Sequence, residues 1–363
     1  MAQDGYQHRD FALQPHIQRG DMAPWWNQGP HRFVFDQFAG RYIVLSFYRG
    51  AGDTVGSAAL HALDELRDLV ANDKAWLFGV SLDSDDHTVR HVDAVFPSVE
   101  FLWDPDGTVY RAYGIGPGRI WIVLDPMLRV IEAIPFMSDG SDIRSLADLM
   151  HALPPPSRFI GFDVQAPVLV LPDVFEPAFC RHLIDVFEQA GGRESGFMQE
   201  VGGKAVEIFD PAWKRRKDHL IDDAALFDAI KERISRRVGL MMRQAFHFQL
   251  TRIERQLIAR YSAGDDGHFG PHRDNTVKAT EHRRFAMSIN LNEDYEGGEV
   301  SFPEYGPKGF KMPVGAALIF SAALLHRVSK VTSGSRYVFV PFLHDEAAEQ
   351  VRLANLQFLA RPA

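Results

Sequence analysis

The sequence contains a single cysteine, Cys180, among its 363 residues. One thiol excludes an intrachain disulfide framework and a zinc site built from several cysteines. Long apolar runs are also missing: the longest extends over about residues 315–325, too short for the roughly 20 residues of a membrane-spanning helix. The first six residues lack the basic and then apolar pattern of a secretory signal. We therefore expect a cytoplasmic protein that does not bind membranes.

Excess basic charge is absent as well. Lys and Arg number 39 against 48 Asp and Glu, which gives a formal net charge of −9. Such a chain has no general attraction for nucleic acid, so we expect no nucleic-acid partner. Apolar residues make up 46% and charged residues 24%, which is typical of globular proteins. At roughly 150 residues per domain the length predicts two domains of ordinary size, or up to three.

A proline run marks the boundary between domains. Pro154, Pro155 and Pro156 are consecutive and follow a stretch with helical spacing at residues 142–150. Prolines end helices and stiffen connecting segments. We therefore predict one domain over residues 1–155 and a second over 160–363.

The first half alternates strands with helices. Residues 42–48 and 76–81 are apolar runs of buried-strand length, and stretches with helical character follow them at 58–70 and 87–96. A hairpin is expected around Asp125. This order predicts an α/β sandwich with a mixed sheet.

The second half begins with a strand and helices and then becomes rich in β-structure. Residues 177–190 are amphipathic and helical, and 224–246 predict one or two further helices. From residue 256 to 343, short strands are separated by Gly, Pro and Asn. This pattern predicts a sandwich or barrel with supporting helices.

The strongest chemical signal lies in this β-rich segment. His272 and Asp274 are separated by one residue, so an extended backbone points both side chains to the same side. His326 follows about fifty residues later in an apolar strand. Two imidazoles and a carboxylate form the facial triad of non-haem Fe(II) oxygenases. One His-x-Asp among 15 histidines carries little weight alone, so other features must support it.

Arg336 and Tyr261 supply that support. Arg336 stands ten residues after His326, across a turn at residues 332–335 that predicts a hairpin. Its guanidinium could bind the far carboxylate of a metal-chelating acid, although a surface arginine in a hairpin is the alternative. Tyr261 lies eleven residues before His272 and offers a phenol to the same carboxylate.

These residues resemble the prolyl-4-hydroxylase-type branch of the 2-oxoglutarate/Fe(II) dioxygenases over about residues 165–345. Four motifs occur in the same order: Tyr261–Gly264, His272-Arg273-Asp274, Gly297–Pro303, and His326 with Arg336. The resemblance implies a double-stranded β-helix, or jelly roll. It also implies that His272, Asp274 and His326 hold Fe(II), while Arg336 and Tyr261 bind the distal carboxylate of 2-oxoglutarate.

Two further segments leave alternatives open. Ala286, Ser288 and Asn290 share one face of a strand, and the resemblance places Asn290 beside 2-oxoglutarate; the alternative is the solvent face of an edge strand. The basic run at residues 214–219 could line the mouth of the site. A solvated loop is the interpretation that we favour for it.

The resemblance implies oxidative decarboxylation of 2-oxoglutarate to succinate and CO₂, coupled to C–H hydroxylation. The cofactors would be Fe(II), 2-oxoglutarate as cosubstrate and O₂, with ascorbate as a candidate reductant. A peptidyl proline, an amino acid and a small metabolite all stay open as substrates, so the partner would be a small molecule or a peptide. The alternative is a redox-fold binding or adaptor protein with a vestigial oxygenase domain.

The first half is similar to a peroxiredoxin of the thioredoxin fold over about residues 30–140. The matching motifs are Leu45–Gly50, Gly79–Ser84, Phe101–Gly107 and Tyr113–Ile115. Peroxide reduction needs a thiolate at the start of the first helix, but Asp53–Ser57 contains none, with Ser57 or a neighbour in its place. Arg119 matches the arginine that would assist the thiolate. The resemblance thus implies a non-peroxidatic domain that could also form a homo-oligomer.

Overall fold

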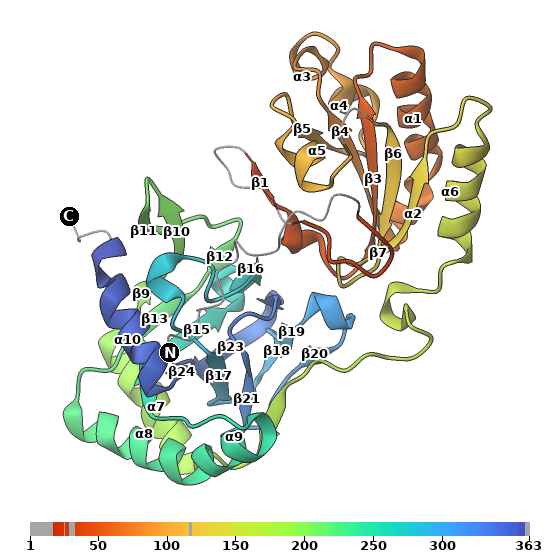
Figure 1. The fold of residues 1–363 in the computed structure, drawn as a ribbon. Coiled ribbons are helices and arrows are strands. Elements are labelled where there is room, and N and C mark those ends of the chain that lie inside the picture. The colour runs from red at the N-terminus through yellow and green to blue at the C-terminus, as the bar shows by residue number, and fades with distance from the viewer. Residues whose placement is uncertain (1–16, 25, 29–32, 116–117, 360–363) are drawn as a thin grey trace. The chain divides into compact units, whose positions relative to one another are not determined.

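The computed structural model describes residues 17–24, 26–28, 33–115 and 118–359 and divides the chain into two units (Figure 1). The first unit comprises Met1–Gln165 with Pro303–Pro307, and the second comprises Ala166–Phe302 and Lys308–Ala363. The first six residues, in which we expect no secretory signal, lie outside the described residues. Within the described part, no helix has the length and apolar character needed to cross a bilayer.

The first unit is built on a five-stranded mixed sheet with the strand order β5-β4-β3-β6-β7. β3 pairs in parallel with β4, and β4 with β5, whereas β6 and β7 are added antiparallel. The strands are β3 (Tyr42–Arg49), β4 (Ala75–Ser81), β5 (Glu100–Trp103), β6 (Ile120–Leu124) and β7 (Val130–Pro135), preceded by the short pair β1 (Asn27–Gln28) and β2 (Phe33–Val34). The α/β sandwich with a thioredoxin-like sheet is thereby confirmed.

The helices of the first unit differ in detail from the prediction. They are α1 (Thr54–Glu65), α2 (Arg67–Ala71), α3 (Asp85–Thr88), α4 (Val92–Val95), α5 (Thr108–Ala112) and α6 (Ser141–Ala152). The helix expected at 58–70 begins earlier, because the side chain of Asp53 accepts a hydrogen bond from the Gly56 amide and caps α1. The single helix expected at 87–96 is wrong: His91 has a φ of 48°, which separates α3 from α4.

The second unit contains two sheets. The larger follows the path β14-β24-β17-β23-β15-β13-β9, with β21, β8 and β18 attached to it, and the smaller has the order β12-β16-β22-β19-β20. The strands are β8 (Leu169–Leu171), β9 (Arg193–Glu194), β10 (Phe197–Val201), β11 (Lys204–Ile208), β12 (Lys214–Arg215), β13 (Lys217–Leu220), β14 (Arg252–Glu254), β15 (Leu257–Ser262), β16 (His268–His272), β17 (Phe285–Asn290), β18 (Tyr295–Gly297), β19 (Val300–Ser301), β20 (Gly309–Phe310), β21 (Ala317–Ser321), β22 (His326–Val328), β23 (Val331–Phe339) and β24 (Phe342–His344). The expected double-stranded β-helix with supporting helices is confirmed.

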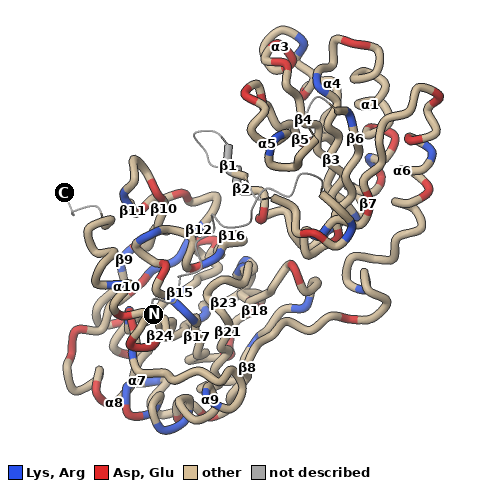
Figure 2. The backbone as a smooth tube through the Cα atoms, viewed as in Figure 1, with Lys and Arg blue, Asp and Glu red and all other residues tan. Residues whose placement is uncertain are grey.

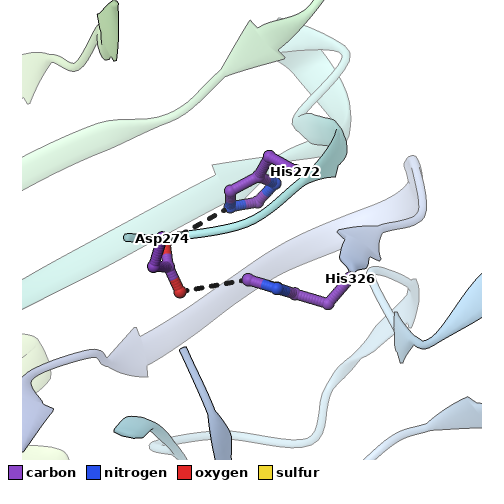
Figure 3. A group of neighbouring side chains, drawn as sticks. All are labelled: His272, Asp274 and His326. Atoms are coloured by element: carbon purple, nitrogen blue, oxygen red, sulfur yellow. Dashed lines mark ion pairs between the residues drawn. The ribbon is translucent and has the colours of Figure 1, made fainter. Parts of the chain in front are cut away.

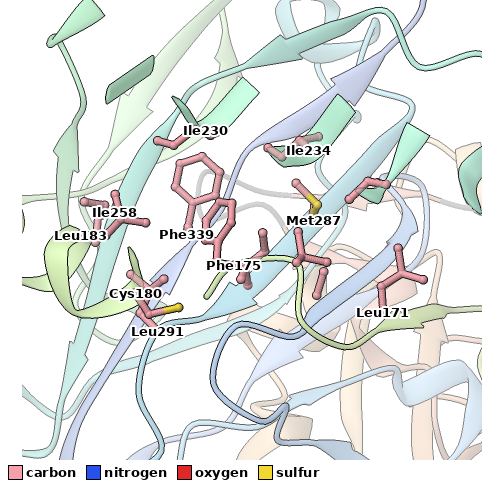
Figure 4. Packing of buried hydrophobic residues seen from close by; sticks show 14 of the residues in the cluster. Leu171, Phe175, Cys180, Leu183, Ile230, Ile234, Ile258, Met287, Leu291 and Phe339 are labelled. Atoms are coloured by element: carbon pink, nitrogen blue, oxygen red, sulfur yellow. The ribbon is translucent and has the colours of Figure 1, made fainter. Parts of the chain in front are cut away.

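Helices cover one face of the larger sheet. They are α7 (Pro177–Ala190), α8 (Ala224–Arg237) and α9 (Gly239–Phe246), and α10 (Glu346–Asn355) follows the last strand. Figure 4 shows side chains from α7 and α8, such as Leu183 and Ile234, packed against strand residues Ile258, Met287 and Phe339. Because alternate residues of a strand face opposite sides, this packing directs Ser288 and Asn290 to the other face of β17.

Charges of both signs are distributed over both units. Figure 2 shows basic and acidic positions interspersed along the chain, without a long block of either sign. This distribution agrees with the modest formal charge of −9.

Candidate functional site

Two strands of the smaller sheet bring the histidines together. His272 ends β16, His326 begins β22, and the two residues are direct partners in the antiparallel ladder. Asp274 lies in the turn after β16, and its carboxylate oxygens are 3.6 Å from His272 Nε2 and 3.4 Å from His326 Nε2 (Figure 3). One ligand atom from each of the three residues lies within 4.8 Å of the others, in a geometry that could hold a metal ion.

The backbone sets the orientation of both imidazole rings. His272 Nδ1 lies 2.8 Å from the carbonyl oxygen of Gly270, and His326 Nδ1 lies 2.9 Å from that of Leu324. A carbonyl oxygen only accepts, so in the neutral rings Nδ1 carries the hydrogen and Nε2 presents its lone pair to Asp274. Burial, and then the nearby His326, lower the pKa of His272 well below its usual range. Three electron-pair donors thus face one another, which suits a divalent cation.

The larger sheet carries a buried guanidinium, that of Arg336 in β23. Arg336 in β23 is 3% exposed, with Nε and Nη2 donating to Asn290 Oδ1 at 3.2 and 3.0 Å and Nη2 also donating to Ser288 Oγ at 3.0 Å. Both acceptors are neutral, and in the part of the chain that the structure describes no carboxylate forms an ion pair with Arg336. The surface-arginine alternative is therefore wrong. A desolvated cation without a counterion favours an anionic ligand.

Tyr261 stands beside this cation. It is the register partner of Arg336 across β15 and β23, and its ring centroid is 5.7 Å from the guanidinium carbon. Its hydroxyl oxygen accepts a hydrogen bond from Arg216 Nη1 at 3.3 Å. Neither the hydroxyl hydrogen of Tyr261 nor Nη1 of Arg336 reaches an acceptor among the described residues. These two donors could together bind a carboxylate.

Asn290 is buried beside Arg336, so the solvent-face alternative for it is wrong. It is 1% exposed, and its amide nitrogen donates to the hydroxyl of Tyr295 and to the carbonyl of Met312, both at 2.7 Å. These bonds turn its oxygen towards Arg336. The side chain therefore orients the guanidinium and presents no spare donor to a ligand.

The basic run at 214–219 is not the solvated loop that we favoured. Lys214, Arg216 and Asp218 point inward, and none of them is more than 13% exposed. The side chain of Lys217, by contrast, is 41% exposed. The alternation follows from the extended backbone of β12 and β13. Because every residue from 214 to 218 is charged, the sequence did not show which of them point inward.

One of the inward side chains, Lys214, lies near the candidate metal centre. Lys214 Nζ donates to Ser195 Oγ at 2.8 Å and lies 4.8 Å from the ring centroid of Phe269. The ring of Phe269 stacks on that of His272 with centroids 3.5 Å apart. Burial, and then the charge of Arg216, lower the pKa of Lys214 well below its usual range. The amino group of Lys214 is thus separated from the candidate metal ligand His272 by the ring of Phe269.

The start of α1, where peroxide chemistry would need a thiolate, carries a carboxylate and no thiol. Asp53 caps α1, accepts from the Gly56 amide at 2.8 Å and forms an ion pair with Arg119. Ser57, which we considered for this place, lies inside the helix. The protein's thiol, Cys180, is buried in α7, and burial raises its pKa to about 11. The described residues therefore offer no reactive thiolate.

Comparisons with known proteins agree with this division. Residues 257–344 match the family model "2OG-Fe(II) oxygenase superfamily", and residues 6–133 match "AhpC/TSA family". A "PKHD-type hydroxylase" of Synechococcus sp. (strain JA-2-3B'a(2-13)) is 34% identical over 94 residues, covering 24% of this chain and 41% of the relative. The chain thus spans about two fifths of the length of this relative.

Two further similarities cover more residues. A PKHD-type hydroxylase of Xanthomonas axonopodis pv. citri is 29% identical over 191 residues, which is 47% of this chain and 75% of the relative. A crystal structure of a 2OG-Fe(II) oxygenase family oxidoreductase from Burkholderia pseudomallei shares 20% identity. It covers 49% of this chain and 85% of its own, with a TM-score of 0.36.

Proposed function

We propose that the chain is an Fe(II)- and 2-oxoglutarate-dependent dioxygenase that hydroxylates a C–H bond. The matches of its two halves to the AhpC/TSA and 2OG-Fe(II) oxygenase family models support the proposal. The observation that carries the proposal is the presence of two complementary sets of atoms in the second unit. Three electron-pair donors converge at His272, Asp274 and His326, and two unused hydrogen-bond donors stand at Arg336 and Tyr261. A metal ion fits the first set, and a carboxylate fits the second.

Each residue has a defined task in this proposal. Nε2 of His272, Nε2 of His326 and the Asp274 carboxylate would hold Fe(II), which leaves open positions for ligands. Arg336 Nη1 and the Tyr261 hydroxyl would bind the distal carboxylate of 2-oxoglutarate, while Asn290 orients Arg336. When bound, the iron supplies the redox chemistry that couples decarboxylation to C–H oxidation. The balanced reaction is 2-oxoglutarate + O₂ + R–H → succinate + CO₂ + R–OH.

The substrate R–H is proposed only by class: a peptidyl proline, an amino acid or a small metabolite. The names of the matched relatives support the hydroxylase outcome. We propose further that the predicted first domain, residues 1–155, is non-peroxidatic, because Asp53 rather than a thiol pairs with Arg119. The alternative function, an adaptor with a vestigial oxygenase domain, has less support, since the triad and the buried Arg336 are both intact.

Succinate formation tests this proposal. The full chain is incubated with Fe(II), 2-oxoglutarate and air, with and without candidate substrates from the three classes, and succinate is quantified. We expect succinate that depends on Fe(II) and O₂ and that is lost in the Asp274→Ala variant. An absence of succinate above the level of that variant under every condition would favour the vestigial alternative.

A further inference from the structure

Asp274 is the triad residue that no β-ladder holds in place. His272 and His326 belong to paired strands, whereas Asp274 lies in the turn that follows β16. Its backbone N–H donates to the carbonyl of Ala322 at 2.9 Å, which ties one side of the residue. The position of its carboxylate therefore depends on what holds the other side.

Arg283 holds that other side. Its Nη1 donates to the backbone carbonyl of Asp274 at 3.3 Å. The side chain is 8% exposed, and the guanidinium carbon lies 3.9 Å from the ring centroid of Phe342. A planar guanidinium fixed on a ring has little freedom to move, so the carbonyl of Asp274 meets a rigid donor.

Glu254 fixes Arg283 in turn. Its two carboxylate oxygens accept from Arg283 Nε at 3.3 Å and Nη2 at 3.2 Å, and His282 Nε2 approaches one of them at 2.6 Å. Burial disfavours the ionised carboxyl, but His282 and Arg283 outweigh that effect and keep the pKa of Glu254 well below its usual range. Glu254 is also the register partner of Phe342 across β14 and β24. The sheet thus supports one face of the guanidinium through Phe342 and one edge through Glu254.

We propose that Arg283 is a positioning residue for Asp274, and that the Glu254–Arg283 clamp (Glu254, Arg283 and His282) sets the place of the carboxylate in the triad. The inference rests on the proposed function, because it concerns the same metal site. All of the clamp's contacts with Asp274 pass through the backbone, so the clamp acts on geometry. Removing such outer partners of a metal ligand typically weakens metal binding about 10- to 100-fold.

Mn(II) binding tests the clamp without relying on turnover. The full-length wild type and variants are titrated with Mn(II) by calorimetry, and thermal unfolding is recorded for each. Arg283→Met removes every donor. Arg283→Lys keeps a positive charge for Glu254, but one ammonium cannot span both the carboxylate and the Asp274 carbonyl. Arg284→Met is the matched control, because the neighbouring Arg284 is exposed.

We expect Arg283→Lys to unfold near the wild-type temperature yet bind Mn(II) about 10- to 100-fold more weakly. Arg284→Met should keep the wild-type unfolding temperature and Mn(II) affinity. If Arg283→Met fails to fold, Arg283→Lys decides the matter. Wild-type Mn(II) affinity in a folded Arg283→Lys protein would overturn the clamp and leave the proposed function standing. If wild type and Asp274→Ala bound Mn(II) equally, the metal site itself would be wrong, and the clamp with it.

Discussion

At the scale of single residues, the candidate site contains two charged side chains of opposite sign, Asp274 and Arg336. The carboxylate of Asp274 faces two imidazole lone pairs, an arrangement that is repulsive unless a cation lies between them. Arg336 is a buried cation with only neutral partners among the described residues. The second unit therefore holds an excess of hydrogen-bond acceptors at the triad and an excess of donors at Arg336. Each excess is relieved by a ligand of opposite charge.

Replacing a triad residue should remove metal binding and leave the fold intact. For His272→Ala, Asp274→Ala and His326→Ala we expect loss of 2-oxoglutarate turnover, because two remaining ligands hold Fe(II) weakly. Circular dichroism and thermal unfolding should stay close to wild type, since the metal binds a preformed barrel. Retention of wild-type iron affinity and turnover in these variants would contradict the triad.

Replacing Arg336 should weaken the binding of 2-oxoglutarate and leave metal binding unchanged. Loss of one partner of a buried charge-assisted hydrogen bond costs several kcal/mol, about a hundredfold or more in affinity. We therefore expect Arg336→Ala to raise the apparent KM for 2-oxoglutarate by that factor with Mn(II) affinity unchanged. Arg336→Lys keeps the positive charge without the guanidinium group. Its apparent KM for 2-oxoglutarate should lie between those of the wild type and Arg336→Ala. An unchanged KM in Arg336→Ala would assign the carboxylate to another cation.

At the scale of secondary-structure elements, ion pairs join the start of α7 to α8. Glu176, the residue before Pro177, forms ion pairs with Arg233 (2.8 Å) and with Arg237. Hydrogen bonds from Arg237 and then Arg233 lower the pKa of Glu176 from 4.5 to about 2. The pairs are partly exposed, with Glu176 44% exposed. Solvent screening therefore limits their contribution to about 1 kcal/mol or less.

Glu176→Gln should lower stability in a pH-dependent way. Because the folded-state pKa is depressed, the contribution is complete above the ordinary value of 4.5 and is lost as the pH falls towards about 2. Urea unfolding midpoints of wild type and Glu176→Gln should differ near neutral pH and converge over that acidic range. A difference that stayed constant with pH would show that the ion pairs do not stabilise the protein.

Elements with strong local signals could be predicted from the sequence. The helix expected at 177–190 is α7 with the same bounds, because proline starts it, Gly191 with a φ of 82° ends it, and Cys180, Leu183 and Phe187 form one buried face. The strand expected at 42–48 is extended by one residue in β3. The break between α3 and α4 was missed, since nothing in a histidine at position 91 signals a left-handed backbone.

Some residues of the candidate site could be predicted from the sequence, and others could not. His272, Asp274, His326, Arg336 and Tyr261 could be selected because their spacing and residue types carry the chemistry. The clamp could not, because Glu254 in β14 and Arg283, just before β17, are 29 residues apart and come together because β24 pairs with both strands. Asp53 was likewise not singled out, because its pairing with Arg119 spans 66 residues.

At the scale of the whole molecule, one unit carries the candidate chemistry, and we propose that the other is non-peroxidatic. We expect the wild type not to consume hydrogen peroxide at peroxiredoxin-like rates, since peroxide reduction requires a thiolate and the Cys180 thiol is buried. Asp53→Cys should give a more reactive thiol than Ser57→Cys, because position 53 adjoins Arg119 and the start of α1. Thiol-dependent peroxide consumption by the wild type would contradict this account.

The central claim is that one chain places a metal ion and the distal carboxylate of 2-oxoglutarate in the same site. The most direct measurement is an anaerobic crystal structure of the full chain with Fe(II) and 2-oxoglutarate, read through the anomalous signal of iron. We predict an iron peak bounded by Nε2 of His272, Nε2 of His326 and the carboxylate of Asp274, with the distal carboxylate of 2-oxoglutarate on Arg336. Iron bound elsewhere, or 2-oxoglutarate without contact to Arg336, would contradict the claim.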